Sequence, residues 1–307
     1  MEDKYKYGTS QLLNFARDSY LERTSRPVYA LIFLLPFIVF YELGTIFINT
    51  DLLNQTQVRV VAFVWLQKLL EYLGFGSKFA WAAPALAVVL ILIALQLAAR
   101  KQWRFWVGDI WPMAIECILL AVPLIVLSLF LNRTAEPQNG IGRFDSSVKQ
   151  IQVVEDVPIR ITSCSVVTAE QPSVMQAGTG EEKTRSLLAD IVTGIGAGIY
   201  EELVFRLILI CALMVLFQNV LHLGHKNAII LSVLVSAALF SAHHHIVYLD
   251  GQFGPSAPFN WTEFGFRTIA GVYFAALFAV RGFGITAGTH AFYDIIATIV
   301  NTVFFQQ

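Results

Sequence analysis

The sequence predicts an all-α polytopic membrane protein, a bundle of about seven or eight transmembrane helices with a polar insert between two membrane halves. Two observations carry this prediction. Of the 307 residues, 56% are hydrophobic and only 14% are charged, whereas about a quarter of the residues in soluble domains are charged. The apolar residues also form long blocks rather than the amphipathic spacing of surface helices. A soluble protein of this length could not bury so much apolar surface.

Short polar segments mark the ends of the predicted spans. One further apolar block, residues 58–73, is interrupted by Arg59, Lys68 and Glu71, so re-entrant, interfacial and spanning arrangements all stay open for it. The predicted spans are residues 28–48, 79–99, 105–131, 187–217, 227–247, 266–280 and 285–305.

The polar segments divide the chain into three predicted regions. Residues 1–131 form an N-terminal amphipathic segment and the first transmembrane helices, residues 132–186 form an extramembrane insert, and residues 187–307 form a second membrane core. Alternating apolar residues at 151–153 and 159–161 predict a small hairpin in the insert. Before the first span, five apolar residues predict one face of a short interfacial helix: Leu12, Leu13, Phe15, Tyr20 and Leu21.

Charge sets the predicted orientation. Basic residues are concentrated before residue 27 and at Arg100, Lys101 and Arg104, so the positive-inside rule places the N-terminus in the cytoplasm and the insert outside. The N-terminal segment lacks the apolar stretch of a cleavable signal peptide, and we expect a multi-pass protein of a bacterial plasma membrane. The net charge of −1 gives no indication of a nucleic-acid partner.

Three charged residues lie inside the predicted span 187–217, in the segment GIYEELVFR. A charge at the bilayer centre costs about 2.5–3.5 kcal/mol on insertion scales, so these side chains must face the protein interior or a wet cavity. Glu202 and Arg206 have the spacing of a helical ion pair. Such a pair leaves Glu201 without a partner, which favours a functional role for Glu201.

Histidines follow in the next spans. His243, His244 and His245 are consecutive, and adjacent helical residues point about 100° apart, so only one or two of them can face a site with Glu201. We interpret His243 and His245 as interfacial or hydrogen-bonded histidines. His290 and Asp294 share one face of the last predicted helix.

These residues bring histidines and carboxylates together in one half of the membrane bundle. Zinc hydrolases use His, Asp and Glu ligands with an open water position, and a general base acting on water is a carboxylate or a histidine. Hydrolysis within the membrane is therefore one hypothesis. Proton or ion translocation is the other, because relays use the same residue types.

Three motifs in this order resemble the CPBP family of intramembrane proteases, which includes the eukaryotic CAAX prenyl endopeptidase and the bacterial Abi-type proteins. The family pattern is E-E-x-x-x-R, then F-x-x-x-H, then H-x-x-x-N or a close variant. The matching segments are EELVFR at 201–206, FSAHH at 240–244 and HAFYD at 290–294. The resemblance covers residues 187–305, which it identifies as the catalytic core.

The resemblance implies a role for each matching residue. Glu201 is implied as the base that activates water, His244 and His290 as the two catalytic histidines, and Glu202 with Arg206 as the supporting pair. The implied activity is an endopeptidase acting on membrane-associated peptide or protein substrates, among membrane lipids. Prenylated substrates are known for the eukaryotic relatives and are not expected in a bacterium.

The chain departs from the family pattern at Asp294, where the eukaryotic type has Asn. An ionised Asp can only accept hydrogen bonds, so it cannot donate to an oxyanion as an amide does. It can orient His290, bind a metal or be kept protonated by burial. The extra carboxylate favours a metallopeptidase with Zn²⁺, and a metal-independent glutamate mechanism is the alternative. The candidate metal ligands are Glu201, His244, His290 and Asp294.

Two further functions stay open. Acidic residues in other predicted spans, Glu42, Asp109 and Glu116, keep a proton- or ion-coupled transporter in consideration. A non-catalytic membrane scaffold or immunity protein is the third interpretation. One geometric question also follows from the predicted spans: His244 lies near the end of one and His290 near the start of another. A shared site then requires mid-depth placement or a short or tilted helix.

Overall fold

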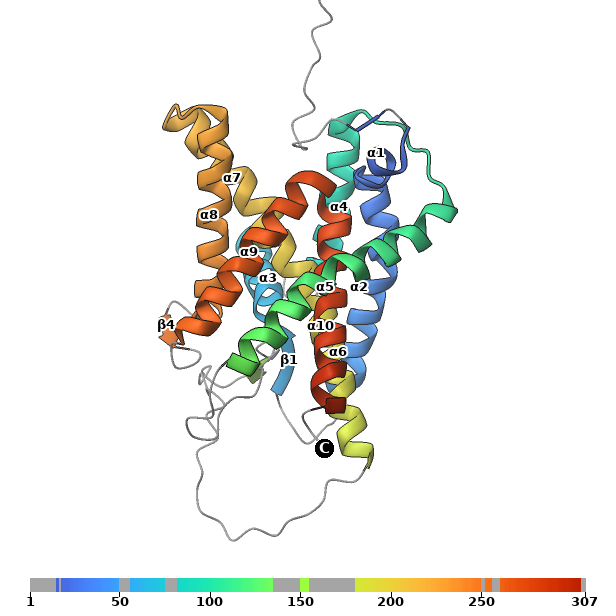
Figure 1. The fold of residues 1–307 in the computed structure, drawn as a ribbon, viewed down its shortest axis with the longest axis vertical. Coiled ribbons are helices and arrows are strands. Elements are labelled where there is room, and N and C mark those ends of the chain that lie inside the picture. The colour runs from blue at the N-terminus through green and yellow to red at the C-terminus, as the bar shows by residue number, and fades with distance from the viewer. Residues whose placement is uncertain are drawn as a thin grey trace, which may run out of the picture.

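The computed structural model describes residues 15–16, 18–49, 56–74, 82–134, 150–154, 180–249, 252–255 and 260–304. These residues form a bundle of helices with two small two-stranded sheets (Figure 1). The predicted all-α polytopic membrane fold is confirmed. Within the described residues, six helices are long and apolar enough to cross a membrane: Pro27–Ile48, Val107–Leu131, Leu187–Val220, His225–His243, Trp261–Arg281 and Phe283–Thr302.

The order of elements follows the predicted two halves. The first half contains α1 (Tyr20–Thr24), α2 (Pro27–Asn49), β1 (Thr56–Val60), α3 (Val61–Tyr72), α4 (Ala83–Ala99), the 3₁₀ turn η2 (Val107–Asp109), α5 (Ile110–Thr134) and β2 (Gln150–Val154). The second half contains α6 (Gly180–Glu202), the π-helix η3 (Leu203–Ile210), α7 (Cys211–Val215), the π-helix η4 (Leu216–Val220), α8 (His225–His243), β3 (Ile246–Leu249), β4 (Gln252–Pro255), α9 (Trp261–Arg281) and α10 (Phe283–Phe304).

The ambiguous block 58–73 contains the end of a strand and a short helix. β1 runs directly into α3, whose 12 residues extend about 18 Å, well short of the ~30 Å hydrocarbon core. The block therefore does not span a membrane as a helix. Its buried side chains Phe63 and Leu66 pack into the bundle instead. The 17-residue α4 is apolar and lies where a span was predicted.

The strand predicted near residue 151 is present, and its described partner is β1. The two strands pair antiparallel, with Thr56 opposite Val154 and Val60 opposite Gln150. The second predicted strand, 159–161, lies outside the described residues, as do Leu12 and Leu13 of the predicted interfacial helix. Most of the predicted insert also lies outside them, so the three region boundaries stay predictions.

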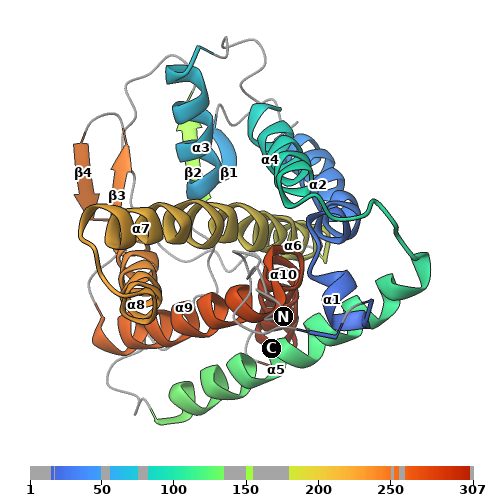
Figure 2. The same cartoon turned by 90° about the horizontal axis from the view of Figure 1, so that it is seen from above.

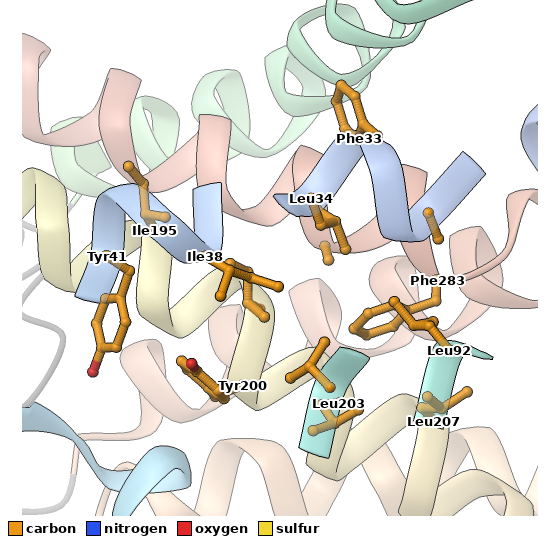
Figure 3. Close-up of a cluster of buried hydrophobic side chains, with 14 of the residues drawn as sticks. Phe33, Leu34, Ile38, Tyr41, Leu92, Ile195, Tyr200, Leu203, Leu207 and Phe283 are labelled. Atoms are coloured by element: carbon orange, nitrogen blue, oxygen red, sulfur yellow. The ribbon is translucent and has the colours of Figure 1, made fainter. Parts of the chain in front are cut away.

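α6 and the helical segments that continue it lie across the middle of the bundle (Figure 2). α2 and α3 contact it from one side, and α10 and α8 contact it from the other. The main hydrophobic core fills the space between these helices. Leu34, Tyr200 and Leu203 are fully buried there (Figure 3). The residues before the predicted active-site motif are therefore anchored in the core.

The two basic segments of the first half meet at one end of the bundle. Lys101 Nζ lies 3.3 Å from a carboxylate oxygen of Glu22, which precedes the first span. Their meeting agrees with placing both segments on one side of the membrane, as the positive-inside rule requires. The assignment of that side to the cytoplasm stays a prediction.

The predicted conflict in depth is resolved by helix placement. α9 runs obliquely through the bundle, and the lower end of α8 lies above the lower end of α10 (Figure 1). The end of α8 reaches the end of α6, where His243 Nε2 lies 3.5 Å from Glu201 Oε1. The ring of Phe240 in α8 connects the two histidines, since its centroid lies 5.1 Å from that of His244 and 6.1 Å from that of His290.

Candidate active site

Glu201 and Glu202 form the end of α6, immediately before the π-helix η3. π-helical segments are rare and frequently occur at functional sites. Glu201 is 4% exposed, and Glu202 and Arg206 are fully buried. Arg206 Nε lies 3.1 Å from Glu202 Oε2, so the ion pair predicted from their spacing is present. The guanidinium carbon also lies 4.1 Å from the ring centroid of Phe240, at cation–π distance.

Glycines let α6 approach α10 closely. A Cβ atom at Gly198 would lie 2.5 Å from the backbone nitrogen of Ala291, and one at Gly194 would lie 2.8 Å from Asp294 Cβ. Neither distance is tolerated between real atoms, so glycine is required at both positions unless the helices move apart. This close packing brings the carboxylate of Glu202 within reach of His290.

His243 and His244 face Glu201 at the end of α8. His243 Nε2 lies 3.5 Å from Glu201 Oε1. One ligand-type atom from each of the three residues lies within 4.8 Å of the other two. Together with Val61 of α3, they line a small pocket, which we call the Glu201 pocket. His245 is buried nearby and packs against the ring of Phe264.

His290 joins the second carboxylate rather than the first. Its Nδ1 lies 2.7 Å from Glu202 Oε1, and its Nε2 lies 3.5 Å from Asp294 Oδ2. The imidazole ring stacks on Phe274 with centroids 4.6 Å apart. Both ring nitrogens therefore face carboxylates. We call Glu202, Arg206, His290 and Asp294 the Glu202 cluster.

Phe240 connects the Glu201 pocket with the Glu202 cluster. Its carbonyl oxygen accepts hydrogen bonds from Nδ1 of His243 and of His244, at 2.5 and 2.9 Å. Its ring centroid lies 5.1 Å from that of His244 and 6.1 Å from that of His290. The phenylalanine of the second motif therefore positions three histidine rings and one face of Arg206.

The outer wall of the Glu201 pocket comes from the first half of the chain. Val61 lines the pocket, and the ring of Trp65 lies 5.8 Å from that of His243 and 6.5 Å from that of Phe205. Neither α3 residue belongs to a motif. Only their contacts in the folded chain place them at the site, so no sequence signal could have identified them.

The structure brings the predicted residues together in two adjacent groups and adds His243. Sequence reasoning interpreted His243 as a structural histidine, because helical Cα–Cβ bonds of neighbours diverge by about 100°. The imidazole rings nevertheless converge, with centroids 3.9 Å apart. Three consecutive histidines at a helix end were the available signal. The predicted site residues lie as follows: Glu201 and His244 in the Glu201 pocket, and Glu202, Arg206, His290 and Asp294 in the Glu202 cluster.

Comparison with known proteins agrees with a membrane-embedded protease. Residues 183–296 match the family model described as type II CAAX prenyl endopeptidase Rce1-like. Over these residues the chain is similar to that family, and the resemblance drawn from the three motifs is confirmed. The match includes both groups of site residues and excludes the α3 wall. No curated protein and no solved structure matches the chain.

Proposed function

We propose that this protein is an intramembrane endopeptidase in which Glu201 activates the water that attacks the peptide bond. The observation that carries the proposal is the Glu201 pocket, in which a buried carboxylate and two histidines meet inside an Rce1-like domain. A carboxylate within hydrogen-bond reach of water can accept its proton as the water attacks a carbonyl carbon. The surrounding apolar helices exclude bulk water and so strengthen electrostatic interactions at the site.

The histidines are proposed to stabilise the oxyanion that forms during attack. His244 lies in the Glu201 pocket. His290 donates from Nδ1 to Glu202, and Nε2 makes only a 3.5 Å contact with Asp294, longer than a good hydrogen bond. When the imidazole ring of His290 is protonated on both nitrogens, Nε2 can donate a hydrogen bond. An oxyanion less than 3.5 Å from Nε2 would accept this bond in place of Asp294.

Asp294 acts in this proposal as a positioning residue. Its packing against Gly194 and its contact with His290 fix the orientation of that imidazole ring. Glu202 holds the opposite ring nitrogen, and Arg206 neutralises Glu202 through the buried ion pair. This positioning role differs from that of the asparagine in the family pattern. The amide of asparagine can donate a hydrogen bond to the oxyanion, whereas an ionised carboxylate cannot.

A metal-dependent form of the reaction uses the same pocket. The histidine nitrogens and the carboxylate are donors of the kind that Zn²⁺ prefers, so the residues present fit this ion. A zinc ion bound there would polarise the carbonyl and acidify the attacking water. The proposed substrate is a membrane-associated peptide or protein segment, reached from surrounding lipid, and the proposed location is a bacterial plasma membrane.

The test uses the full chain purified in detergent, as wild type and as Glu201→Ala. Both are incubated with a library of membrane-tethered peptides, with and without a chelator. We expect specific cleavage by the wild type and none by the variant, with equal thermal unfolding temperatures. Cleavage by Glu201→Ala at the wild-type rate would exclude Glu201 as the base. No cleavage by either protein would shift the weight to a scaffold or a transporter.

The acidic residues that suggested transport have local partners in the structure. Glu42 accepts a hydrogen bond from Tyr200 at 3.1 Å. Asp109 binds Arg23 at 3.0 Å, and Glu116 binds Arg281. Each is therefore explained by a contact that holds two helices together. These pairings favour the endopeptidase over a proton relay.

A further inference from the structure

We propose that the segment joining α4 to α5 binds the headgroup of an anionic phospholipid from the surrounding membrane. Five exposed residues form this headgroup site: Arg100, Trp103, Arg104, Trp106 and Trp111. The site lies in the first half of the chain, outside the residues that match the family model. It therefore does not depend on the proposed peptidase activity.

The headgroup site lies where the apolar surface of the bundle ends. The apolar helix α4 ends at Ala99, and the next candidate span begins at Val107. The residues between two such apolar segments lie at the depth of the lipid headgroups. The segment also runs along the outer edge of the bundle (Figure 2), so its outward side faces the surrounding membrane.

Buried polar side chains hold this segment in place from its inner side. Gln96, which is 1% exposed, donates a hydrogen bond to the carbonyl oxygen of Lys101 at 3.0 Å. The backbone N–H of Trp106 donates to the hydroxyl oxygen of Tyr29 at 3.2 Å, and that hydroxyl donates to Asp109 at 2.9 Å. The backbone is therefore anchored to the bundle, while the aromatic and basic side chains of the headgroup site stay exposed.

The two arginines of the headgroup site, Arg100 and Arg104, form no ion pair with any residue that the structure describes. Other cations already neutralise the nearby acids, in the pairs Asp18–Arg26, Glu22–Arg26, Glu22–Lys101 and Asp109–Arg23. The exposed arginines therefore add positive charge that an anion can neutralise. A guanidinium group presents its N–H donors in a fork that matches the oxygens of a phosphate.

The tryptophans indicate that this anion belongs to a lipid. Three of the six tryptophans of the chain lie in the headgroup site, and Trp103, Trp106 and Trp111 are 54%, 64% and 77% exposed. Tryptophan is enriched where membrane meets water, because its ring is apolar and its N–H donates a hydrogen bond. Indoles beside guanidinium groups fit a ligand that joins apolar chains to a negatively charged phosphate. A zwitterionic headgroup fits less well, since its own cation compensates the phosphate.

Native mass spectrometry of the full chain in detergent tests the proposal by counting bound lipid. The delipidated protein is titrated with phosphatidylglycerol and, separately, with phosphatidylcholine that has the same acyl chains. We expect phosphatidylglycerol to bind at least about tenfold tighter, and its affinity to fall about fivefold in Arg100→Gln and in Arg104→Gln. The matched control is Lys226→Gln, which removes an exposed positive charge at the start of α8. It should bind phosphatidylglycerol like the wild type.

Two results would overturn the proposal: equal affinity of the wild type for the two lipids, or wild-type affinity for phosphatidylglycerol when both arginines are replaced by Gln. Trp106→Ala should weaken the binding of both lipids alike, because the indole contacts the part that they share. Soluble glycerol phosphate separates a lipid site from a site for free phosphate. We expect it to leave the lipid bound, and displacement at equal concentration would reject the lipid as the ligand. Thermal unfolding of every variant separates loss of the ligand from loss of the fold.

Discussion

Two regions of this molecule each contain a glutamate from a long helix, but the partners of the two carboxylates differ. Beside the N-terminal helix α1, Arg281 at the end of α9 binds Glu116 through Nε and Nη2. Arg281 also donates a hydrogen bond to the hydroxyl of Thr24 at 2.9 Å. Tyr20 donates to the same glutamate at 2.7 Å. We call these four residues the N-terminal clasp. Every acceptor there meets a donor, as in other strong bidentate pairs.

In the Glu201 pocket, a histidine takes the place of the guanidinium. The carboxylate of Glu201 faces His243 Nε2 at 3.5 Å, and that nitrogen carries a lone pair if the ring is neutral. The comparison teaches that buried charge alone does not identify a reactive site. The N-terminal clasp connects α1, α5 and α9, whereas Glu201, His243 and His244 line a small pocket. Equivalent substitutions in the two regions should therefore have opposite effects.

The largest expected effect is on catalysis, from Glu201→Gln. The amide keeps the size of the side chain but cannot accept a proton from water, so the cleavage rate should fall by about 10²–10⁴-fold. Unfolding stability should stay within about 1 kcal/mol, because Gln relieves the cost of a buried charge. Peptide cleavage and thermal unfolding in detergent measure the two effects. A large loss of stability with an unchanged cleavage rate would show that Glu201 stabilises the fold and does not take part in catalysis.

The corresponding change in the N-terminal clasp is Glu116→Gln. It leaves the guanidinium of Arg281 buried without its anion, which should lower the free energy of unfolding by about 3–5 kcal/mol. Denaturant titration in detergent measures this. Glu263→Gln is the control, since its pair with Arg267 is 43% exposed on the glutamate side and should contribute about 0–1 kcal/mol. Equal effects of the two substitutions would contradict a stabilising clasp.

A smaller effect on stability is expected from Gly198→Ala, at the contact between α6 and α10. Gly198→Ala adds a methyl group against the backbone of Ala291, so α6 and α10 must separate slightly, at a cost of about 1–3 kcal/mol. Cleavage should fall more than stability, since Glu202 and His290 move apart. Gly265→Ala is the control, because nothing lies within 4 Å of its new methyl group. We expect that variant to be as stable as the wild type or more so.

The smallest expected effect is the pH dependence of stability that comes from Glu22 in α1. Burial opposes ionisation of Glu22, but hydrogen bonds from Arg26 and Lys101 outweigh it and hold the pKa of Glu22 below its ordinary value of 4.5. Glu22 therefore stabilises the fold fully above pH 4.5, and this contribution is lost as pH falls through the lower folded-state pKa. Its size should be about 1 kcal/mol or less.

Glu22→Gln tests this pH dependence. The unfolding temperature of the variant should lie below that of the wild type at pH 7, and the difference should shrink as the pH is lowered beneath 4.5. A difference that stays constant with pH would show that the lost contribution is not the charge of Glu22. Lys226→Gln, at an exposed residue near the start of α8, serves as a control for the loss of a surface charge.

The sequence predicted the parts of this fold that depend on local composition. Apolar blocks predicted the long helices, and the i,i+4 spacing predicted the pair of Glu202 and Arg206. It could not predict that β1 pairs with β2, because the two strands are separated by several helices and no local pattern specifies the partner. The length of α3 was similarly hidden, since an apolar run does not reveal where a strand becomes a helix.

The candidate site was predicted in its residues and less well in its grouping. Motif spacing selected Glu201, His244 and His290, but periodicity describes only the direction in which each Cα–Cβ bond leaves the helix. The reach of an imidazole ring brought His243 to Glu201 as well. The packing of α10 against α6 places His290 beside Glu202 rather than Glu201. Both outcomes depend on tertiary contacts that no single helix contains.

The position of α10 has a consequence for how the protein is made. His290 and Asp294 lie on this helix, and every other described element precedes it in the chain. During synthesis α3, α6 and α8 leave the ribosome first, so Glu201 can meet His243 while Glu202 still has only Arg206 as a partner. The nascent chain therefore brings the Glu201 pocket and the complete Glu202 cluster together only after α10, the last described helix, has been inserted. A chain released before α10 would already contain most of the described helices but would lack His290 and Asp294.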